Sequence, residues 1–335
     1  KKPVYLYTWD GTTEGSEGLS ASKQWLDTPQ LERKHSEQIG WMLNGLIDYN
    51  RTFGQHTIGV TFGMEGQKKQ YEETWAFRQG FISDSKPELS LGGEEGQSAR
   101  GYSWKETRLN YFGRASYNYL ERYLFEFVWR VDGSYRFPSR YGFFPGVSLA
   151  WRASEENWWK DNIRFIDYFK LRGSVSQTGN DALVDGDGNY DHSIQYLTTY
   201  AFNNAGTVFG GQENKRLYPS RTPNPNITWE VGTTYNVGLD FKFLQNRLSW
   251  ETDVFYHKRT NMLISRNASL PEITGITLPR ENLGEMKNRG FESLVSWQDK
   301  IGEVEYGASL NMTYARNEIT FWDEVQNVPE YQFST

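Results

Sequence analysis

The residues best suited to chemistry lie in one glycine-rich segment, Asp185-Gly186-Asp187-Gly188-Asn189-Tyr190-Asp191. Asp185, Asp187, Asn189 and Asp191 could converge their oxygen atoms on Ca²⁺, which prefers carboxylate and carbonyl ligands. An EF-hand loop requires Gly where Tyr190 stands and Glu where Tyr196 stands, so that motif fails. The sequence therefore leaves two interpretations open: a calcium site, or a solvated external loop built of turn-favouring residues.

No other group of residues has the spacing of a catalytic or metal site. The four histidines, His35, His56, His192 and His257, have no partner at metal-ligand spacing. Cysteine is absent, and no Gly-x-Ser-x-Gly or comparable nucleophile motif occurs. Alternation predicts that His56 and His257 lie on the polar face of their strands. We therefore expect no enzyme activity and, calcium aside, no cofactor.

Composition narrows the class of protein. The 335 residues carry 36 Lys and Arg against 42 Asp and Glu, a net charge of −6, which argues against a nucleic-acid partner. Aromatic residues make up 16% of the chain, far too many for a disordered protein. No stretch is long and apolar enough for a transmembrane helix. The length would allow two or three soluble domains, and a polar, aromatic and glycine-rich chain without helical spans also leaves the transmembrane β-barrel open.

Hydrophobicity follows a period of two, which indicates strands with one apolar and one polar face. Tyr123, Phe125, Phe127, Trp129 and Val131, for example, alternate with more polar neighbours. The pattern predicts about eleven strands, several of them longer than the roughly 9–11 residues that a membrane-crossing strand needs. The predicted strands are 2–9, 37–50, 56–70, 103–119, 123–135, 142–152, 168–177, 227–243, 248–259, 284–297 and 303–316.

The connections between these strands alternate in length. Short turns are predicted at 51–55, 120–122, 244–247 and 298–302, with a medium connection at 153–167. A short helix is predicted within 155–168. Longer loops are predicted at 10–36, 71–102, 136–141, 178–226 and 260–283. Short periplasmic turns alternating with long extracellular loops are typical of outer-membrane barrels. Aromatic residues on the apolar face also gather beside the short turns, as in an interfacial girdle: Tyr49, Tyr119, Tyr123, Trp151, Phe169, Phe243 and Trp297.

Four motifs in order resemble the SusC/RagA-type TonB-dependent transporters of the Gram-negative outer membrane. They are DGSYRF at 132–137 with RYGFFPGVSLAWR at 140–152, LRGSVSQTGN at 171–180, NPNITWE at 224–230 and NLGEMKNRGFE at 282–292. The resemblance implies a barrel of 22 strands, a plug domain and a segment that contacts the TonB complex. We expect residues 1–335 to be part of the barrel domain, with the plug and N-terminal regions outside this sequence.

The resemblance also implies a function. Such a protein imports a nutrient, commonly a glycan oligosaccharide or a peptide, together with a SusD-like surface lipoprotein. It is embedded in the lipid of the outer membrane as a multi-pass barrel, and the TonB complex acts on it through a segment outside this sequence.

Two sets of residues are candidates for contacts along the transport path. The first set alternates into the polar face and is predicted to face the lumen, where it would meet water, the plug or substrate: Arg108, Arg114, Glu126, Arg130, Asp240 and Asp253. The second set lies in or beside the predicted long loops and suits sugars, peptides or a protein partner: Trp104, Tyr190, Tyr196, Tyr200, Asn203, Asn204 and Tyr218.

Three other functions are compatible with parts of the pattern. A passive porin shares the alternation and the aromatic girdle but needs no plug. A soluble carbohydrate-binding β-sandwich also has alternating strands, although it has no reason to gather aromatic residues at one end of them. An outer-membrane hydrolase is disfavoured by the missing nucleophile motif.

Overall fold

A computed structural model shows an almost entirely β protein. It describes residues 5–9, 19–24, 29–82, 85–183, 191–192, 194–265 and 279–323. The chain divides into two compact units, residues 1–41 with 67–106 and residues 42–66 with 107–335, and each is treated by itself. No helix in the described ranges is long and apolar enough to cross a membrane.

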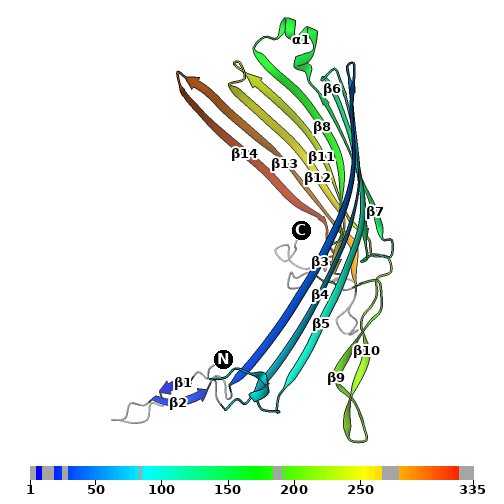
Figure 1. Cartoon of the computed structure of the whole chain (residues 1–335), viewed down its shortest axis with the longest axis vertical. Helices are drawn as coiled ribbons and strands as arrows, with labels where there is room; N and C mark the ends of the chain where they lie inside the picture. The colour runs from blue at the N-terminus through cyan, green and yellow to red at the C-terminus, as the bar shows by residue number, and fades with distance from the viewer. Residues whose placement is uncertain are drawn as a thin grey trace. The chain divides into compact units, whose positions relative to one another are not determined.

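Ten strands form one antiparallel sheet in the order β14-β13-β12-β11-β8-β7-β6-β5-β4-β3. Figure 1 shows β8, β11, β12, β13 and β14 side by side. Strands that follow one another in the chain are neighbours, except that the β9–β10 hairpin interrupts β8 and β11. The strands are β3 (Gln30–Phe53), β4 (His56–Gln79), β5 (Ser98–Tyr119), β6 (Tyr123–Ser134), β7 (Tyr141–Trp151), β8 (Ile166–Asn180), β11 (Glu230–Phe243), β12 (Leu248–Ser265), β13 (Arg280–Ile301) and β14 (Val304–Phe321).

The prediction of an all-β antiparallel sheet is confirmed, but the predicted first strand, 2–9, was placed wrongly. Residues Tyr5–Trp9 form β1, which pairs with β2 (Leu19–Gln24) in a separate two-stranded sheet. β1 has five residues, fewer than the roughly 9–11 that a membrane-crossing strand needs. The described sheet therefore has ten strands, with β3 and β14 at its edges.

Several predicted loops are shorter than expected because the strands extend further. β4 runs to Gln79 and β5 starts at Ser98, so only 80–97 remain of the predicted loop 71–102. The predicted loop 178–226 contains a second hairpin, β9 (Thr199–Phe209) with β10 (Gln212–Arg221). Most of the remaining connection between β12 and β13, residues 266–278, lies outside the described residues.

Short helical segments lie in two connections. The connection between β7 and β8 contains the 3-10 turn η2 (Ala153–Glu155) and the helix α1 (Asn157–Asn162), which confirms the helix predicted there. A further 3-10 turn, η1 (Leu89–Leu91), lies between β4 and β5. Figure 1 shows α1 at one end of the sheet and the β9–β10 hairpin at the other. We call these the turn end and the loop end.

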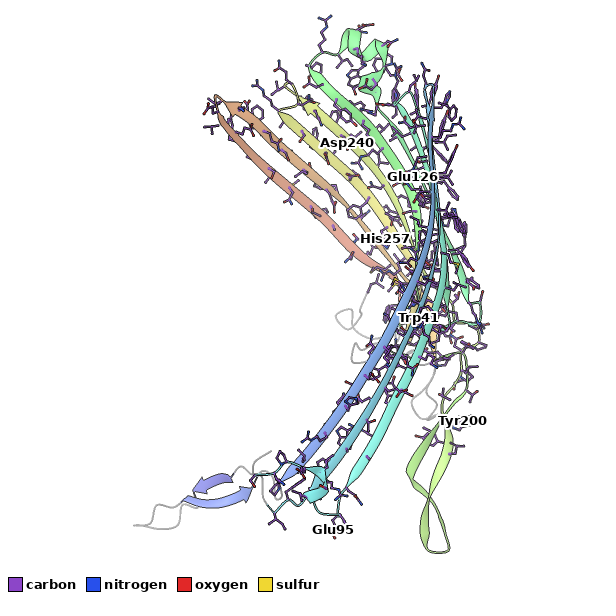
Figure 2. All side chains as sticks on the ribbon, in the orientation of Figure 1. Trp41, Glu95, Glu126, Tyr200, Asp240 and His257 are labelled. Carbon is purple, nitrogen blue, oxygen red and sulfur yellow. The ribbon has the colours of Figure 1, made fainter. Side chains whose placement is uncertain are left out.

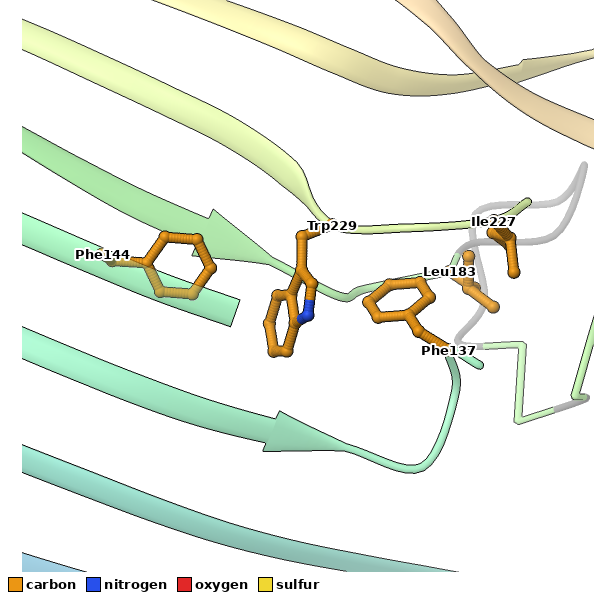
Figure 3. Close-up of a cluster of buried hydrophobic side chains, with 5 residues drawn as sticks. All are labelled: Phe137, Phe144, Leu183, Ile227 and Trp229. Carbon is orange, nitrogen blue, oxygen red and sulfur yellow. The ribbon is translucent and has the colours of Figure 1, made fainter. Parts of the chain in front are cut away.

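The two faces of the sheet differ in what they expose. Cross-strand partners such as Phe125 and Leu149, or Val237 and Val254, put apolar side chains on one face. Many of these side chains are open to the surroundings: Leu149 is 59% exposed and Val254 61%. A water-soluble sheet would bury such a face against a second layer. The buried hydrophobic cluster lies instead at the loop end, around Phe137 and Trp229 (Figure 3).

Candidate transport wall and loop-end rim

The polar face of β8, β11 and β12 is organised around Arg172. Its Nε donates a hydrogen bond to Asp240 Oδ1 over 2.9 Å, and its terminal nitrogen donates to Asp253 Oδ2 over 2.8 Å. Asn236 Nδ2 donates to the other oxygen of Asp253 over 2.7 Å. The register places Gly238 between Arg172 and Asp253, where a Cβ would lie 2.5 Å from a carboxylate oxygen of Asp253. Because Gly238 has no side chain, Arg172 and Asp253 have room to contact each other across β11.

Further along the same face, Arg114 of β5 pairs with Glu126 of β6. Its Nε donates to Glu126 Oε2 over 2.7 Å. Arg130 pairs with Asp132 on its own strand over 2.8 Å. A depression of about 480 Å³ lies between the Arg114 pair and Arg172, with Ser148 among its lining residues. Figure 2 labels Glu126, Asp240 and His257 on this part of the sheet. The charges of the wall are thus paired largely with one another.

The two histidines assigned to the polar face have different places. His257 lies there, and its Nδ1 is 2.8 Å from the Thr234 hydroxyl. The prediction for His56 was wrong. Its Nδ1 is 2.7 Å from the Tyr117 hydroxyl, and its ring lies 4.9 Å from that of Tyr119, among the aromatic residues of the apolar face. His56 has the same strand parity as Ile58, so correct counting along β4 would have placed it there.

At the loop end, a buried polar network joins the sheet to the long connection between β8 and β11. Asp181 accepts a hydrogen bond from Ser134 Oγ over 2.7 Å and pairs with Arg108 at 2.9 Å. The fully buried Arg136 donates to the main-chain oxygen of Asp191 over 2.7 Å. Gln195 Nε2 donates to Asp191 Oδ2 over 3.2 Å. We call this network the rim clasp: Arg108, Ser134, Arg136, Asp181, Asp191 and Gln195.

The hydrophobic cluster reinforces the rim clasp. The Trp229 ring lies between Phe144 and Phe137, at centroid distances of 5.4 and 5.2 Å (Figure 3). Leu183 and Ile227, at the two ends of the long connection, are buried in the same cluster. Both stems of the connection are therefore fixed to the sheet. The predicted loop 136–141 contributes Phe137 to this cluster and Arg136 to the rim clasp, and both side chains are fully buried.

Between these stems, the β9–β10 hairpin displays aromatic residues. Tyr200 is 61% exposed and Tyr218 37%. The hairpin turns at Gly210 and Gly211, whose φ angles of +62° and +79° favour glycine. Tyr196, predicted to bind substrate or a partner, packs against the hydrophobic cluster instead of standing free. Tyr190 and the side chains of Asn203 and Asn204 lie outside the described part of the structure.

Trp104 belongs to the other compact unit, in which β3, β4 and β5 continue beyond the predicted strand ends. It lies in β5, and its ring stacks on Tyr71 of β4 at 5.6 Å. Arg100 lies over the ring of Trp75 at 4.3 Å. A salt bridge of 2.9 Å joins Lys34 to Glu73. This unit thus carries a second group of stacked aromatic and charged side chains.

The calcium interpretation stays a prediction. Asp185, Asp187 and Asn189 lie outside the described residues. Asp191, the fourth candidate, is held in the rim clasp by Gln195 and Arg136. Within the described ranges, no group of three or more metal-ligating side chains comes together.

Comparison with known proteins decides the family. A profile of the family described as TonB dependent receptor-like, beta-barrel, matches residues 4–335. The chain belongs to this family. It is 31% identical over 283 residues to the TonB-dependent receptor SusC of Bacteroides thetaiotaomicron, covering 83% of this chain and 27% of that protein. It is 29% identical over 274 residues to the TonB-dependent receptor P3 of Formosa agariphila, covering 81% of this chain and 26% of that protein.

Solved structures give the same fold. The RagAB peptide importer in its open-open state superposes with a TM-score of 0.75 at 22% identity, covering 88% of this chain and 31% of that chain. The chain spans about a quarter of the length of the curated relatives it matches. It is therefore part of a TonB-dependent receptor barrel in the outer membrane, and the predicted family resemblance is confirmed. In such a barrel the apolar face meets lipid, the turn end lies in the periplasm and the loop end outside the cell.

Proposed function

We propose that this chain forms part of the barrel of a TonB-dependent importer that carries an oligosaccharide or a peptide across the outer membrane. A SusD-like surface lipoprotein would cover the extracellular end, and the TonB complex would supply energy through a segment outside this sequence. Family membership and the SusC relative support this proposal. Its work is transport, in which this chain supplies a wall and binding contacts rather than covalent chemistry.

The rim clasp is the observation that carries the proposal. A loop that only connects two strands has no need of a buried arginine and carboxylate at its base, because burying charges is costly unless they are paired. Here Asp181 and Arg136 hold the stem that follows β8, and the buried Ile227 holds the stem that precedes β11. The hairpin between the two stems exposes Tyr200 and Tyr218. Aromatic residues on a fixed support are typical of interfaces. We therefore propose that β9–β10 contacts the lipoprotein and borders the substrate chamber.

The substrate class is proposed from the chemistry of the exposed side chains. Tyrosine rings such as those of Tyr200 and Tyr218 can stack on sugar rings or on peptide side chains, while neighbouring polar groups supply hydrogen bonds. The wall beneath them carries charges that are paired with one another, such as Arg172 with Asp240. Such a wall offers polar contacts without a strong excess of either sign. This suits uncharged glycans and mixed-charge peptides better than strongly charged ligands.

Removal of the hairpin tests the proposal. In the full-length protein, residues 199–221 would be replaced by a short Gly-Ser linker, which keeps the rim clasp intact. We expect normal barrel levels in the outer membrane, loss of lipoprotein co-purification and at least a tenfold fall in uptake. A matched control carries the same linker as an insertion between Gln245 and Asn246, in the periplasmic turn, and should keep both activities.

Two results would contradict the proposal. Unchanged co-purification and uptake after the deletion would mean that the hairpin only covers the barrel. Uptake that persists in cells without TonB would indicate a passive porin. Uptake assays with oligosaccharide and peptide mixtures, analysed by mass spectrometry of the depleted medium, would then decide between the two substrate classes.

A further inference from the structure

The lipid-facing surface has a gap at Gly173. Cross-strand pairing aligns a row of outward-facing residues across five strands, β5, β6, β7, β8 and β11: Tyr117, Phe125, Leu149, Gly173 and Val237. Gly173 is the member of this row without a side chain, and a Cβ built there would meet nothing within 4 Å. Its neighbours Leu149 and Val237 are 59% and 55% exposed. The row therefore contains a notch with open space above Gly173.

The notch is part of a larger groove. A depression of about 590 Å³ extends from Val237 across Gly173 to the aromatic residues Phe125, Tyr123 and Trp151. Tyr123 is the first residue of β6 and Trp151 the last residue of β7, so this end of the groove reaches the periplasmic turns. At about 3.3 Å per residue, the whole groove lies within roughly 20 Å of those turns. Tyrosine and tryptophan at this level are typical of the lipid headgroup interface.

The surroundings of the groove determine what can fill it. The lining is apolar or aromatic apart from Arg172, whose guanidinium is bonded to Asp240 and Asp253 on the polar face. Water entering the groove would therefore find few hydrogen-bonding partners. The groove is continuous with the apolar face that meets lipid, where hydrocarbon chains are the available apolar molecules. Because it opens at the periplasmic end, it faces the inner leaflet, which consists of phospholipid.

We infer that this groove binds one acyl chain of a phospholipid from the periplasmic leaflet, held at a fixed place on the barrel. The bound acyl chain lies over Gly173, between the side chains of Leu149 and Val237. Its carbonyl end lies beside Tyr123 and Trp151. This site is separate from the lumen and from the extracellular loops, so it does not depend on the proposed function.

Photolabelling of the full-length protein tests the site. The protein would be placed in phospholipid nanodiscs that contain phosphatidylethanolamine with a diazirine on one acyl chain. Mass spectrometry would compare labelling of peptides from 147–151, 171–175 and 235–239 with that of 291–297, another part of the lipid-facing surface. We expect at least a threefold excess of label in the groove peptides.

A groove-filling variant provides the critical comparison. Gly173→Leu places a side chain in the open space and should abolish the excess label. Gly66→Leu is the matched control, since a Cβ at Gly66 on β4, a strand with neighbours on both sides, also meets nothing within 4 Å and this residue lies outside the groove. The control variant should keep the excess of label in the groove peptides. If Gly173→Leu fails to fold, as judged by heat-modifiable migration, Val237→Trp fills the groove from its other side.

Three results would overturn the inference. Equal labelling of the groove peptides and of 291–297 would mean that lipids exchange freely around the barrel and that none is held in the groove. An excess that persists in both Gly173→Leu and Val237→Trp would place the bound lipid elsewhere. In asymmetric bilayers, an excess that comes from labelled lipopolysaccharide rather than from labelled phospholipid would assign the groove to the outer leaflet.

Discussion

Which medium a side chain meets depends on its parity along the strand, because successive residues of a strand point to opposite faces. For most positions this could be predicted from the sequence alone. Phe125 and Glu126, for example, lie on opposite faces as the alternation predicts. Contacts within a face could not be predicted, because they depend on register. The ion pairs of Arg172 with Asp240 and Asp253, for example, form only when β8, β11 and β12 pair in the correct register.

A pair of adjacent substitutions tests the assignment of faces. Phe127 lies near the middle of β6 on the lipid-facing side, so Phe127→Arg should destabilise the barrel by roughly 2–4 kcal/mol. Val128→Arg, on the lumen side of the same strand, should cost less than about 1 kcal/mol. Urea unfolding of the full-length protein in liposomes, followed by tryptophan fluorescence, measures both. Equal losses for the two variants would show that the faces are assigned wrongly.

Glu156, in the periplasmic connection, should make stability depend on pH. The Tyr123 hydroxyl donates to its carboxylate over 2.5 Å, and the Trp151 indole and Arg122 donate over 3.2 Å each, which together lower the pKa of Glu156. A lowered pKa stabilises the folded state above the ordinary glutamate pKa of about 4.3, and this stabilisation is lost as the pH falls through the folded-state value.

The matching variant is Glu156→Gln. We expect wild type to be more stable than this variant at pH 6 to 7, and the difference to shrink as the pH falls below about 4.3. Urea unfolding midpoints of both proteins, measured across this pH range, test this expectation. A difference that stays constant with pH would mean that Glu156 acts through packing rather than through its charge.

At the scale of elements, strand ends were the least predictable feature. The alternation in β4 stops near Gln67-Lys68-Lys69-Gln70, where both faces become polar, although the strand continues to Gln79. Alternation records the contrast between lipid and lumen, and beyond the membrane both faces meet water. The β9–β10 hairpin was missed for the same reason. Its Gly210-Gly211 pair, which favours a tight two-residue turn, was the available signal.

The rim clasp should be the most sensitive polar element of the loop end. Asp181→Ala removes the acceptor of Ser134 and the partner of Arg108, and hydrogen bonds to a buried charge are worth about 1.5–3 kcal/mol each. Hydrogen exchange should increase in the described parts of the β8–β11 connection, while β11 and β12 stay protected. Glu126→Ala, which breaks the more exposed pair with Arg114, should cost about 1 kcal/mol or less and leave that connection protected. Equal exchange in both variants would rule out a clasp.

At the scale of the molecule, the described sheet is an open part of a closed structure. Its edges are β3, with 24 residues, and β14, with 18. Each edge presents unpaired main-chain N–H and C=O groups, and lipid offers them no hydrogen-bonding partner. Side chains near these edges are correspondingly exposed, as Leu43 and Leu310 are. We therefore expect β3 and β14 to pair with further strands in the intact receptor.

This requirement predicts that residues 1–335 expressed alone, with an export signal, do not form a stable barrel in the outer membrane. Each unsatisfied edge group costs several kcal/mol in hydrocarbon, and the two edges expose many of them. We expect the isolated chain to be degraded or to migrate without heat-modifiability on gels, whereas the full-length receptor migrates as a folded barrel. Co-expression with the rest of the receptor should restore folding. Stable insertion of the isolated chain as a heat-modifiable monomer would mean that β3 and β14 can close on each other, and the large-barrel assignment would then fail.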